Sequence, residues 1–218
     1  MAPASAGVAV LSITLLAVAG PLLGLSPWIV TGVAALALGS LTLDAARFGG
    51  RGGNLVAEAL PGGQERLRRI AIHEAGHALA AAADGLPVRQ VLVGSLACLR
   101  AGLGSSGSTE FEPPASAKLS LEDLRRWSRV LQAGMAAETL CYSQAAVGGA
   151  DDRALLGRLW GLSGHDVQTA QREQRRARRE VEQLLRAQRQ PLELQAARLL
   201  LQAPRLGHPS PTEPSPAA

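Results

Sequence analysis

Residues 70–80 read Ile-Ala-Ile-His-Glu-Ala-Gly-His-Ala-Leu-Ala. They belong to a helix predicted over 64–83, where apolar and small residues recur at helical spacing. On a helix, His73 and His77 lie one turn apart on the same face, and both imidazoles can bind one metal ion. Gly76 is about 1 kcal/mol less favourable than alanine in a helix. We therefore expect a close packing contact at that position.

The pattern H-E-x-x-H is typical of a catalytic zinc site. Zinc lowers the pKa of a bound water toward neutrality and polarises a peptide carbonyl. Glu74, between the two histidines, can take the proton of that water and hand it to the leaving amine. The pattern thus predicts peptide hydrolysis with Glu74 as general base and acid. A catalytic zinc needs a third protein ligand, and spacing alone leaves several candidates open: Glu138, Asp151, Asp152, His165 and Asp166.

Composition limits the class of protein. The chain has 218 residues, of which 47% are hydrophobic and only 3% aromatic, so alanine, leucine and valine must fill the core. The formal net charge is +4, but basic residues in 172–189 are mixed with glutamates, as on a solvated helix face. Because aromatic side chains for base stacking are nearly absent, we expect no nucleic-acid binding. Cys98 and Cys141 form no C-x-x-C pair, and we expect two free, buried thiols in a reducing compartment.

The N-terminal 43 residues contain no charged side chain. Two apolar runs, about 7–25 and 28–43, are separated by Ser26-Pro27, where the proline favours a turn. The first run is long enough to cross a bilayer, which takes about 20 residues, and the second is close to that limit. Small residues on both runs would let the two helices approach closely. The pattern of residues 1–43 therefore predicts a hairpin of two transmembrane helices.

Two other interpretations of this N-terminal stretch fit less well. A secretory signal peptide has basic residues before its apolar core, and none is present, while a plastid transit peptide is less apolar. Basic residues follow the second apolar run, and none precedes the first. These residues are Arg47, Arg51, Arg66, Arg68 and Arg69. The positive-inside rule then predicts a multi-pass membrane protein whose C-terminal domain lies on the cytoplasmic side or its organellar equivalent.

The remainder of the chain divides into three segments. Residues 44–63 are rich in glycine and predict a linker. Residues 64–202 predict the folded domain. Residues 203–218 are rich in proline and predict a disordered tail.

The folded domain is predicted to be mainly helical with a small β element. We expect a strand over 88–93 and a second over 97–103, followed by a Gly/Ser-rich loop. Ser120 can cap a helix over 120–142, with Asp123 at the capping-box position. Further helices are expected from Asp151, over 166–187 and over 191–201.

Several blocks of this domain resemble the peptidase domain of the FtsH family (peptidase family M41). Residues 72–79, I-H-E-A-G-H-A-L, are close to the active-site helix of that family, and 87–93 resemble the strand that follows it. Residues 133–138, A-G-M-A-A-E, resemble its G-G-R-A-A-E helix. Residues 148–152, G-G-A-D-D, fall where the family has G-A-S-N-D, whose aspartate is the third zinc ligand. The apolar pattern of 181–200 resembles its paired C-terminal helices.

The resemblance covers 69–202 and implies a helical, zincin-like peptidase domain. It implies that Zn²⁺ is held by His73, His77 and Asp152, with Asp151 as the neighbour of the third ligand, and that Glu74 is catalytic. It also implies a protein or peptide substrate and six-fold assembly.

The chain departs from the family in three respects. It contains no G-x-x-x-x-G-K-[ST] motif, so it cannot hydrolyse ATP by the family's route. The segment between Asp152 and Trp160 is shorter than in the family by about two turns of helix, at about 3.6 residues per turn. The P-R-G element expected after Val93 is missing, and in the family a strand in that region helps to hold the substrate backbone.

The sequence thus predicts a membrane-anchored zinc metalloendopeptidase that hydrolyses membrane or unfolded proteins, in a bacterial inner membrane or a thylakoid membrane. The alternative is a non-catalytic or regulatory partner subunit of a full-length FtsH-type ATP-dependent protease. A third interpretation, an intramembrane metalloprotease, is disfavoured because charged residues over 64–69 precede the motif and 70–83 is too short to span a bilayer.

Overall fold

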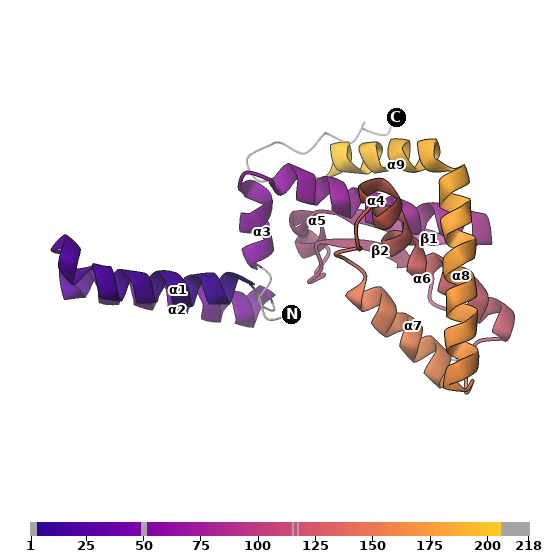
Figure 1. Ribbon diagram of the computed structural model, residues 1–218, viewed down its shortest axis with the longest axis horizontal. Coiled ribbons are helices and arrows are strands. Elements are labelled where there is room, and N and C mark those ends of the chain that lie inside the picture. The colour runs from indigo at the N-terminus through magenta and orange to yellow at the C-terminus, as the bar shows by residue number, and fades with distance from the viewer. Residues whose placement is uncertain (1–3, 49–51, 115, 117, 206–218) are drawn as a thin grey trace, which may run out of the picture.

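The computed structural model describes residues 4–48, 52–114, 116 and 118–205. Within these ranges the chain forms nine α-helices, one short 3₁₀ helix and one two-stranded sheet. This confirms the predicted mainly helical class with a small β element. Figure 1 shows the two N-terminal helices extending away from a domain that contains the elements from α4 onward.

The N-terminal helices are α1 (Ala4–Ala19) and α2 (Pro27–Phe48), which pack against each other and are joined through η1 (Pro21–Leu23). In the part of the chain that the structure describes, Pro27–Ala46 is the one stretch of helix long and apolar enough to cross a membrane. α1 has 16 residues, fewer than the about 20 that a crossing needs. The first apolar run, predicted to be long enough to cross, thus forms a helix shorter than a crossing needs, and the predicted pair of crossings is not supported.

Residues 44–63, predicted as a glycine-rich linker, are largely helical. α2 continues to Phe48, and α3 (Gly52–Ala59) follows it. The backbone N–H of Gly52 donates to the Asp44 carboxylate at 2.6 Å, and a Cβ at Gly52 would collide with that carboxylate. This glycine therefore permits a close contact between two helices.

The domain is organised around α4 (Gly63–Asp84) and α6 (Leu121–Tyr142), which pack through alanines. A Cβ at Gly76 of α4 would lie 2.7 Å from the carbonyl oxygen of Ala133 and 2.7 Å from the Cβ of Ala137. Gly76 thus allows the two helices to approach closely, which confirms the packing contact expected for it. α8 (Val167–Ala187) and α9 (Arg189–Gln202) cover this core with apolar side chains, among them Val181, Leu185, Leu192 and Leu199.

The sheet differs from the prediction in its second strand. β1 (Val88–Val93) lies where a strand was predicted. Residues 97–103, predicted as the next strand, are instead part of α5 (Ser95–Arg100) and the turn after it, and β2 (Gly107–Phe111) lies in the predicted Gly/Ser-rich loop. The two strands pair in antiparallel orientation.

A contact from another element explains why α5 is a helix. A short apolar run fits a helix or a strand equally well by pattern. Here the backbone N–H of Ser95 donates to both oxygens of the Glu58 carboxylate of α3, at 3.0 Å each. The first N–H groups of a helix have no partner within the helix, and a carboxylate beside them stabilises the helix start. Here the carboxylate belongs to Glu58, which lies 37 residues before Ser95 in the sequence.

The predicted starts of the later helices are confirmed. Before α6, Ser120 Oγ accepts from the Asp123 N–H at 3.1 Å, and before α8, Asp166 Oδ1 accepts from the Thr169 N–H at 2.8 Å. α7 (Ala150–Leu162) begins directly after Gly149. A second apolar cluster joins α7 to α6, with Leu124, Trp127, Leu131, Leu156, Leu159 and Trp160 among its members.

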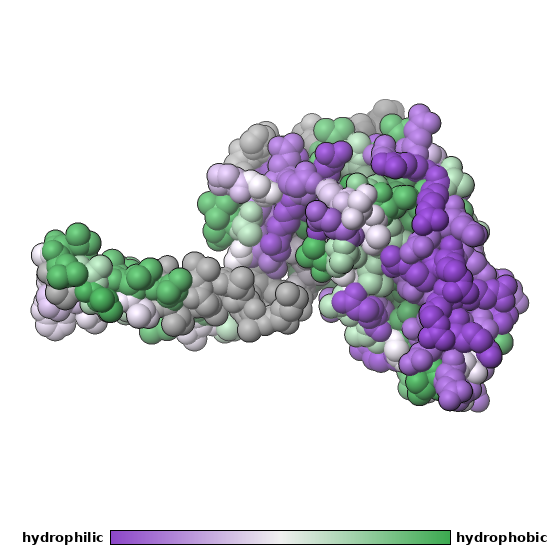
Figure 2. All heavy atoms as spheres, viewed as in Figure 1, coloured by the Kyte–Doolittle hydropathy of each residue, from purple (hydrophilic) through white to green (hydrophobic). Residues whose placement is uncertain are grey.

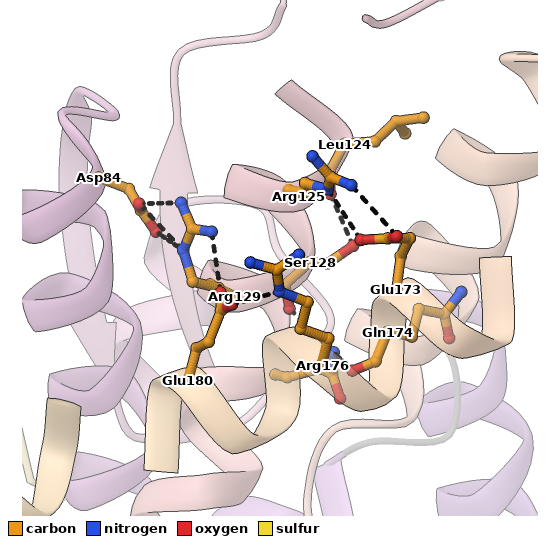
Figure 3. Close-up of polar contacts among 10 residues, drawn as sticks. Asp84, Leu124, Arg125, Ser128, Arg129, Glu173, Gln174, Arg176 and Glu180 are labelled. Carbon is orange, nitrogen blue, oxygen red and sulfur yellow. Dashed lines mark hydrogen bonds and ion pairs between the residues drawn. The ribbon is translucent and has the colours of Figure 1, made fainter. Parts of the chain in front are cut away.

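Ion pairs fix α8 to α4 and α6 (Figure 3). The Arg129 guanidinium on α6 donates to the Asp84 carboxylate at the end of α4, at 2.9 Å from Nε, and to Glu180 of α8 at 3.2 Å. Arg125 donates to Glu173 of α8 at 2.8 and 3.2 Å. These partly buried pairs hold α8 against α6 and, through Arg129, join both helices to the end of α4.

Two smaller predictions concern the tail and the cysteines. Of the predicted disordered tail, 203–218, the part from 206 to 218 lies outside the described residues, and Ala203 is buried against the core. Cys98 and Cys141 are both free, as predicted; Cys98 is buried and Cys141 is half-buried.

Candidate metal centre

Two histidines of α4 lie close together inside the domain. The ring centroids of His73 and His77 are 4.8 Å apart, with an angle of 71° between the ring planes. The two residues are 8% and 2% exposed. Because α4 packs against α6, these polar rings lie at a helix interface, where each ring nitrogen needs a partner.

Asp152 reaches the two rings from the first turn of α7. Its Oδ2 lies 3.1 Å from His73 Nε2 and 3.5 Å from His77 Nε2. Gly149, with φ of 86°, lies directly before this turn in the left-handed conformation that favours glycine. The three side chains each offer one ligand atom, all within 4.8 Å of one another, and could hold a metal ion.

The other candidates for the third ligand lie elsewhere. Asp151 is exposed, and Asp166 caps the start of α8. The His165 ring packs against Trp160, with centroids 5.5 Å apart. Glu138 is close to the site but contacts His73 from the opposite side of the ring, at Nδ1.

The two distances from Asp152 to the histidine nitrogens are close to the separations found around one metal ion. In a tetrahedral site with ligands about 2.0–2.2 Å from the metal, neighbouring ligand atoms are separated by about 3.3 Å. The separations of Asp152 Oδ2 from His73 and His77 Nε2, 3.1 and 3.5 Å, lie on either side of that value. Two imidazole nitrogens and one carboxylate oxygen also suit zinc chemically.

Hydrogen bonds at the far nitrogens turn both Nε2 atoms toward Asp152, where they could bind a metal ion. His77 Nδ1 lies 2.7 Å from the carbonyl oxygen of Val130, which can only accept, so Nδ1 carries the proton. His73 Nδ1 lies 2.7 Å from Glu138 Oε1 and donates to that carboxylate in the same way. Partners of this kind fix the tautomer and ring orientation of metal-ligating histidines.

Glu138 is itself held by the backbone. It is 2% exposed, and its carboxylate accepts from the N–H groups of Val147 at 3.0 Å and Gly148 at 3.2 Å. Burial raises the pKa of Glu138, but the hydrogen bond from His73 and those from the backbone outweigh it and lower the pKa below its ordinary value. Glu138 is therefore an anion that orients His73.

Gly134 of α6 leaves the space between the two rings open. A Cβ at this position would lie 2.4 Å from His73 Nε2 and 2.6 Å from His77 Nε2. Atoms that are not bonded do not approach so closely, so any larger residue would push the two nitrogens apart. The convergence of the histidines thus depends on a glycine in the facing helix.

Glu74 lies on the next position of α4 and is held by the sheet. It is 5% exposed, and its Oε2 accepts from the Thr109 hydroxyl of β2 at 2.7 Å. Gly107 lies against the other oxygen, and a Cβ added to this glycine would lie 2.6 Å from Glu74 Oε1. Burial raises the pKa of Glu74, and the nearby His77 and His73 partly offset this. A buried carboxylate with a raised pKa suits proton transfer.

The charges around His73 favour a cation. Burial lowers the pKa of His73, but Asp152 and Glu138 outweigh it and raise the pKa to about 10. Burial raises the pKa of Asp152, but hydrogen bonds from His73 and His77 outweigh it and hold the pKa well below its usual value. The carboxylates thus favour positive charge at this site, which either a proton on His73 or a bound metal ion would supply.

Comparison with known proteins adds no assignment. A scan of the chain against models of known protein families found no match, and a search of curated proteins found no significant match. The chemistry of the site must therefore be inferred from its own geometry.

Three contributors to the site are not evident from the sequence: Thr109, Gly134 and the Val130 carbonyl. A weak signal exists for Gly134, because a glycine inside an alanine-rich helical run indicates close packing. For Thr109 no local signal exists, since it lies in a stretch predicted as loop. A backbone carbonyl carries no residue-specific signal at all.

Proposed function

We propose that this chain is a zinc metalloendopeptidase with a zincin-like, helical peptidase domain. The observation that carries the proposal is the convergence of His73, His77 and Asp152, whose ligand atoms lie within 4.8 Å of one another. Glu74 lies between the two histidines on the same helix, where a general base of a zinc peptidase is needed. A site that held zinc for structure alone would have no use for that carboxylate.

The division of chemical work follows from these positions. Zinc bound by the three ligands would supply Lewis acidity, which makes water more acidic and polarises a peptide carbonyl. Glu74 accepts the proton of the attacking water at its carboxylate and donates it to the nitrogen of the leaving amine. The peptide C–N bond breaks, and a carboxylic acid and an amine result. Thr109 keeps the carboxylate oriented during both transfers.

The substrate class follows from the strand beside Glu74. Among the described residues, β2 pairs only with β1, so its other edge has no partner strand. Thr109 of β2 contacts Glu74, which places this strand next to the reacting groups. An extended peptide can bind such an edge through main-chain hydrogen bonds. Recognition of the backbone suits unfolded or membrane proteins as substrates.

The N-terminal helices supply the membrane anchor in this proposal. α2 crosses the bilayer, and α1, which packs against α2, lies beside it in the membrane. Arginines after α2 place the domain on the cytoplasmic or stromal side of a bacterial inner membrane or a thylakoid membrane. An anchored peptidase meets membrane proteins at high local concentration.

One observation favours a second function, that of a non-catalytic or regulatory partner of an FtsH-type ATP-dependent protease. His73, Glu74 and His77 are only 8%, 5% and 2% exposed. A substrate reaches them only if neighbouring elements move, and an ATPase partner or an oligomer of this chain could provide that movement. In this function the domain contributes contact surfaces.

Cleavage of an unfolded substrate by the full-length chain in detergent distinguishes the two functions. With casein as substrate, we expect wild-type protein and the exposed control Glu112→Gln to cleave at equal rates. Glu74→Gln should retain zinc but lose activity by about 100-fold or more. Equal cleavage by Glu74→Gln would refute the mechanism. Bound zinc without cleavage, together with co-purification of an ATPase, would support the second function.

A further inference from the structure

α3 connects the N-terminal helices to the domain and is held at both ends. At its start, Gly52 N–H donates to the Asp44 carboxylate of α2 at 2.6 Å. Near its end, the Glu58 carboxylate accepts from the Ser95 hydroxyl at 2.6 Å and from its backbone N–H at 3.0 Å. Figure 1 shows α3 running across the direction of α2. These contacts fix the orientation of α3 between the two parts.

The outer side of α3 is apolar. Between Gly52 and Leu60 the chain has one charged residue, Glu58, and its carboxylate is turned to the domain. Val56 and Leu60 are 59% and 57% exposed. The Leu60 N–H donates to the Val56 carbonyl at 3.1 Å, so the two side chains lie one turn apart on the same side.

The water-facing side of α8 is charged, in contrast to the outer side of α3. The outer side of α8 carries Arg172, Arg175 and Arg179, which are all exposed. Figure 2 shows this hydrophilic surface over α8, and it shows apolar atoms beside α3 on the side of the N-terminal helices. The uncharged outer side of α3 therefore fits an apolar environment.

We propose that α3 lies in the headgroup region of the bilayer, with Val56 and Leu60 inserted at the boundary of the acyl chains. The inference rests on the proposed crossing of the membrane by α2, and it is independent of the peptidase chemistry. A helix that runs across a membrane span lies along the membrane surface, and its outer apolar side chains then meet lipid. α3 thus seats the domain against the membrane.

Charged groups beside α3 fit the lipid headgroups. Arg66 is exposed, and its guanidinium donates to Asn54 of α3 at 2.6 Å. Arg68 is also exposed at the start of α4. Guanidinium groups next to an inserted apolar side can bind the phosphates of anionic lipids, while their stems remain at the interface.

Spin labels on the full-length chain test this placement. Single cysteines at Val56 and Leu60 are labelled in a Cys141→Ala background, in which Cys98 is buried. Leu194→Cys and Leu201→Cys on α9, 54% and 77% exposed, are matched controls. Leu36→Cys on α2 reports the anchor. The protein is reconstituted in vesicles of phosphatidylcholine and phosphatidylglycerol, and collisions with oxygen and with a water-soluble nickel chelate are measured.

The expected result is a ratio of oxygen to nickel collisions several-fold higher at Val56 and Leu60 than at the α9 controls. A water-like ratio at Val56 and Leu60, with a lipid-like ratio at Leu36, would overturn the inference while the anchor stands. A water-like ratio at Leu36 as well would overturn both. A third outcome is a low collision rate with both reagents together with spin–spin broadening between labels. It would show that a second copy of the chain covers α3, and it would also overturn the proposed contact with lipid.

Discussion

Replacing Gly134 with alanine should abolish metal binding while the fold remains. The new methyl group would lie 2.4 Å from His73 Nε2 and 2.6 Å from His77 Nε2, so the rings must move apart. Glu138 and the Val130 carbonyl hold the far nitrogens at 2.7 Å, which limits how far they can move. Overpacking costs about 1–3 kcal/mol, and alanine in place of glycine in a helix returns about 1 kcal/mol. The net loss of stability is therefore modest.

The effect on metal affinity should be much larger than the effect on stability. Loss of one outer hydrogen-bond partner of a ligand costs about 10–100-fold in affinity, and displacing two ligand nitrogens should exceed that range. Zinc content is measured by mass spectrometry after equilibration with a competing chelator, and stability by denaturant unfolding. Gly157→Ala is the matched control, because a Cβ at that position of α7 meets nothing within 4 Å. If Gly134→Ala retained zinc as wild type does, the assigned geometry would be refuted.

Two further changes probe the surroundings of the site, and a third probes the ion pair between Arg125 of α6 and Glu173 of α8. Glu138→Gln removes the anion behind His73 and should weaken zinc binding by about 10–100-fold; unchanged affinity in a competition titration would show that Glu138 does not orient the ring. Thr109→Val should keep zinc and lower kcat by about tenfold or more, because the Glu74 carboxylate loses its hydrogen bond; kcat equal to wild type would argue against this positioning role. Arg125→Met tests a pH effect. The hydrogen bond from Arg125 is the main cause that lowers the pKa of Glu173 below its ordinary value of 4.5, so this pair stabilises the fold above that pH and the contribution is lost as the pH falls through the lowered value. Denaturant unfolding between about pH 5 and pH 3 should show a steeper loss of stability for wild type than for the variant, and equal slopes would count against it.

The long helices could be predicted from the sequence because their signals are local. Ser120 and Asp166 cap helices through contacts three residues away, so the starts of α6 and α8 are visible in the chain itself. The position of α4 followed from its helical spacing, and the packing contact at Gly76 followed from the cost of a glycine inside a helix.

The elements that differ from prediction depend on distant contacts. α5 begins where Glu58, far back in the chain, meets the N–H of Ser95. β2 forms in a Gly/Ser-rich stretch because β1 offers a partner edge. Residues 44–63 were interpreted as a glycine-rich linker, whereas Gly52 begins α3 and contacts Asp44 of α2.

The candidate metal ligands were predicted more completely than their surroundings. His73 and His77 follow from spacing on one helix, but spacing alone left several acidic residues and His165 open as third ligand. The structure brings Asp152 to the two histidines, and it places Glu138 on the opposite nitrogen of His73. Spacing does not reveal that distinction, because it depends on the packing of α6 against α4 and of α7 against α6. The resemblance of 148–152 to the G-A-S-N-D block had implied Asp152.

The most direct test of the proposed zinc site compares metal content and casein cleavage in the same preparations of wild type, Asp152→Asn and Asp151→Asn. The matched pair differs only in whether the altered aspartate reaches the two histidines. We expect wild type and Asp151→Asn to bind one zinc per chain and to cleave casein. We expect Asp152→Asn to lose both the zinc and the cleavage. Wild-type protein without zinc, or an Asp152→Asn variant that retains zinc and cleaves casein, would contradict the proposed site.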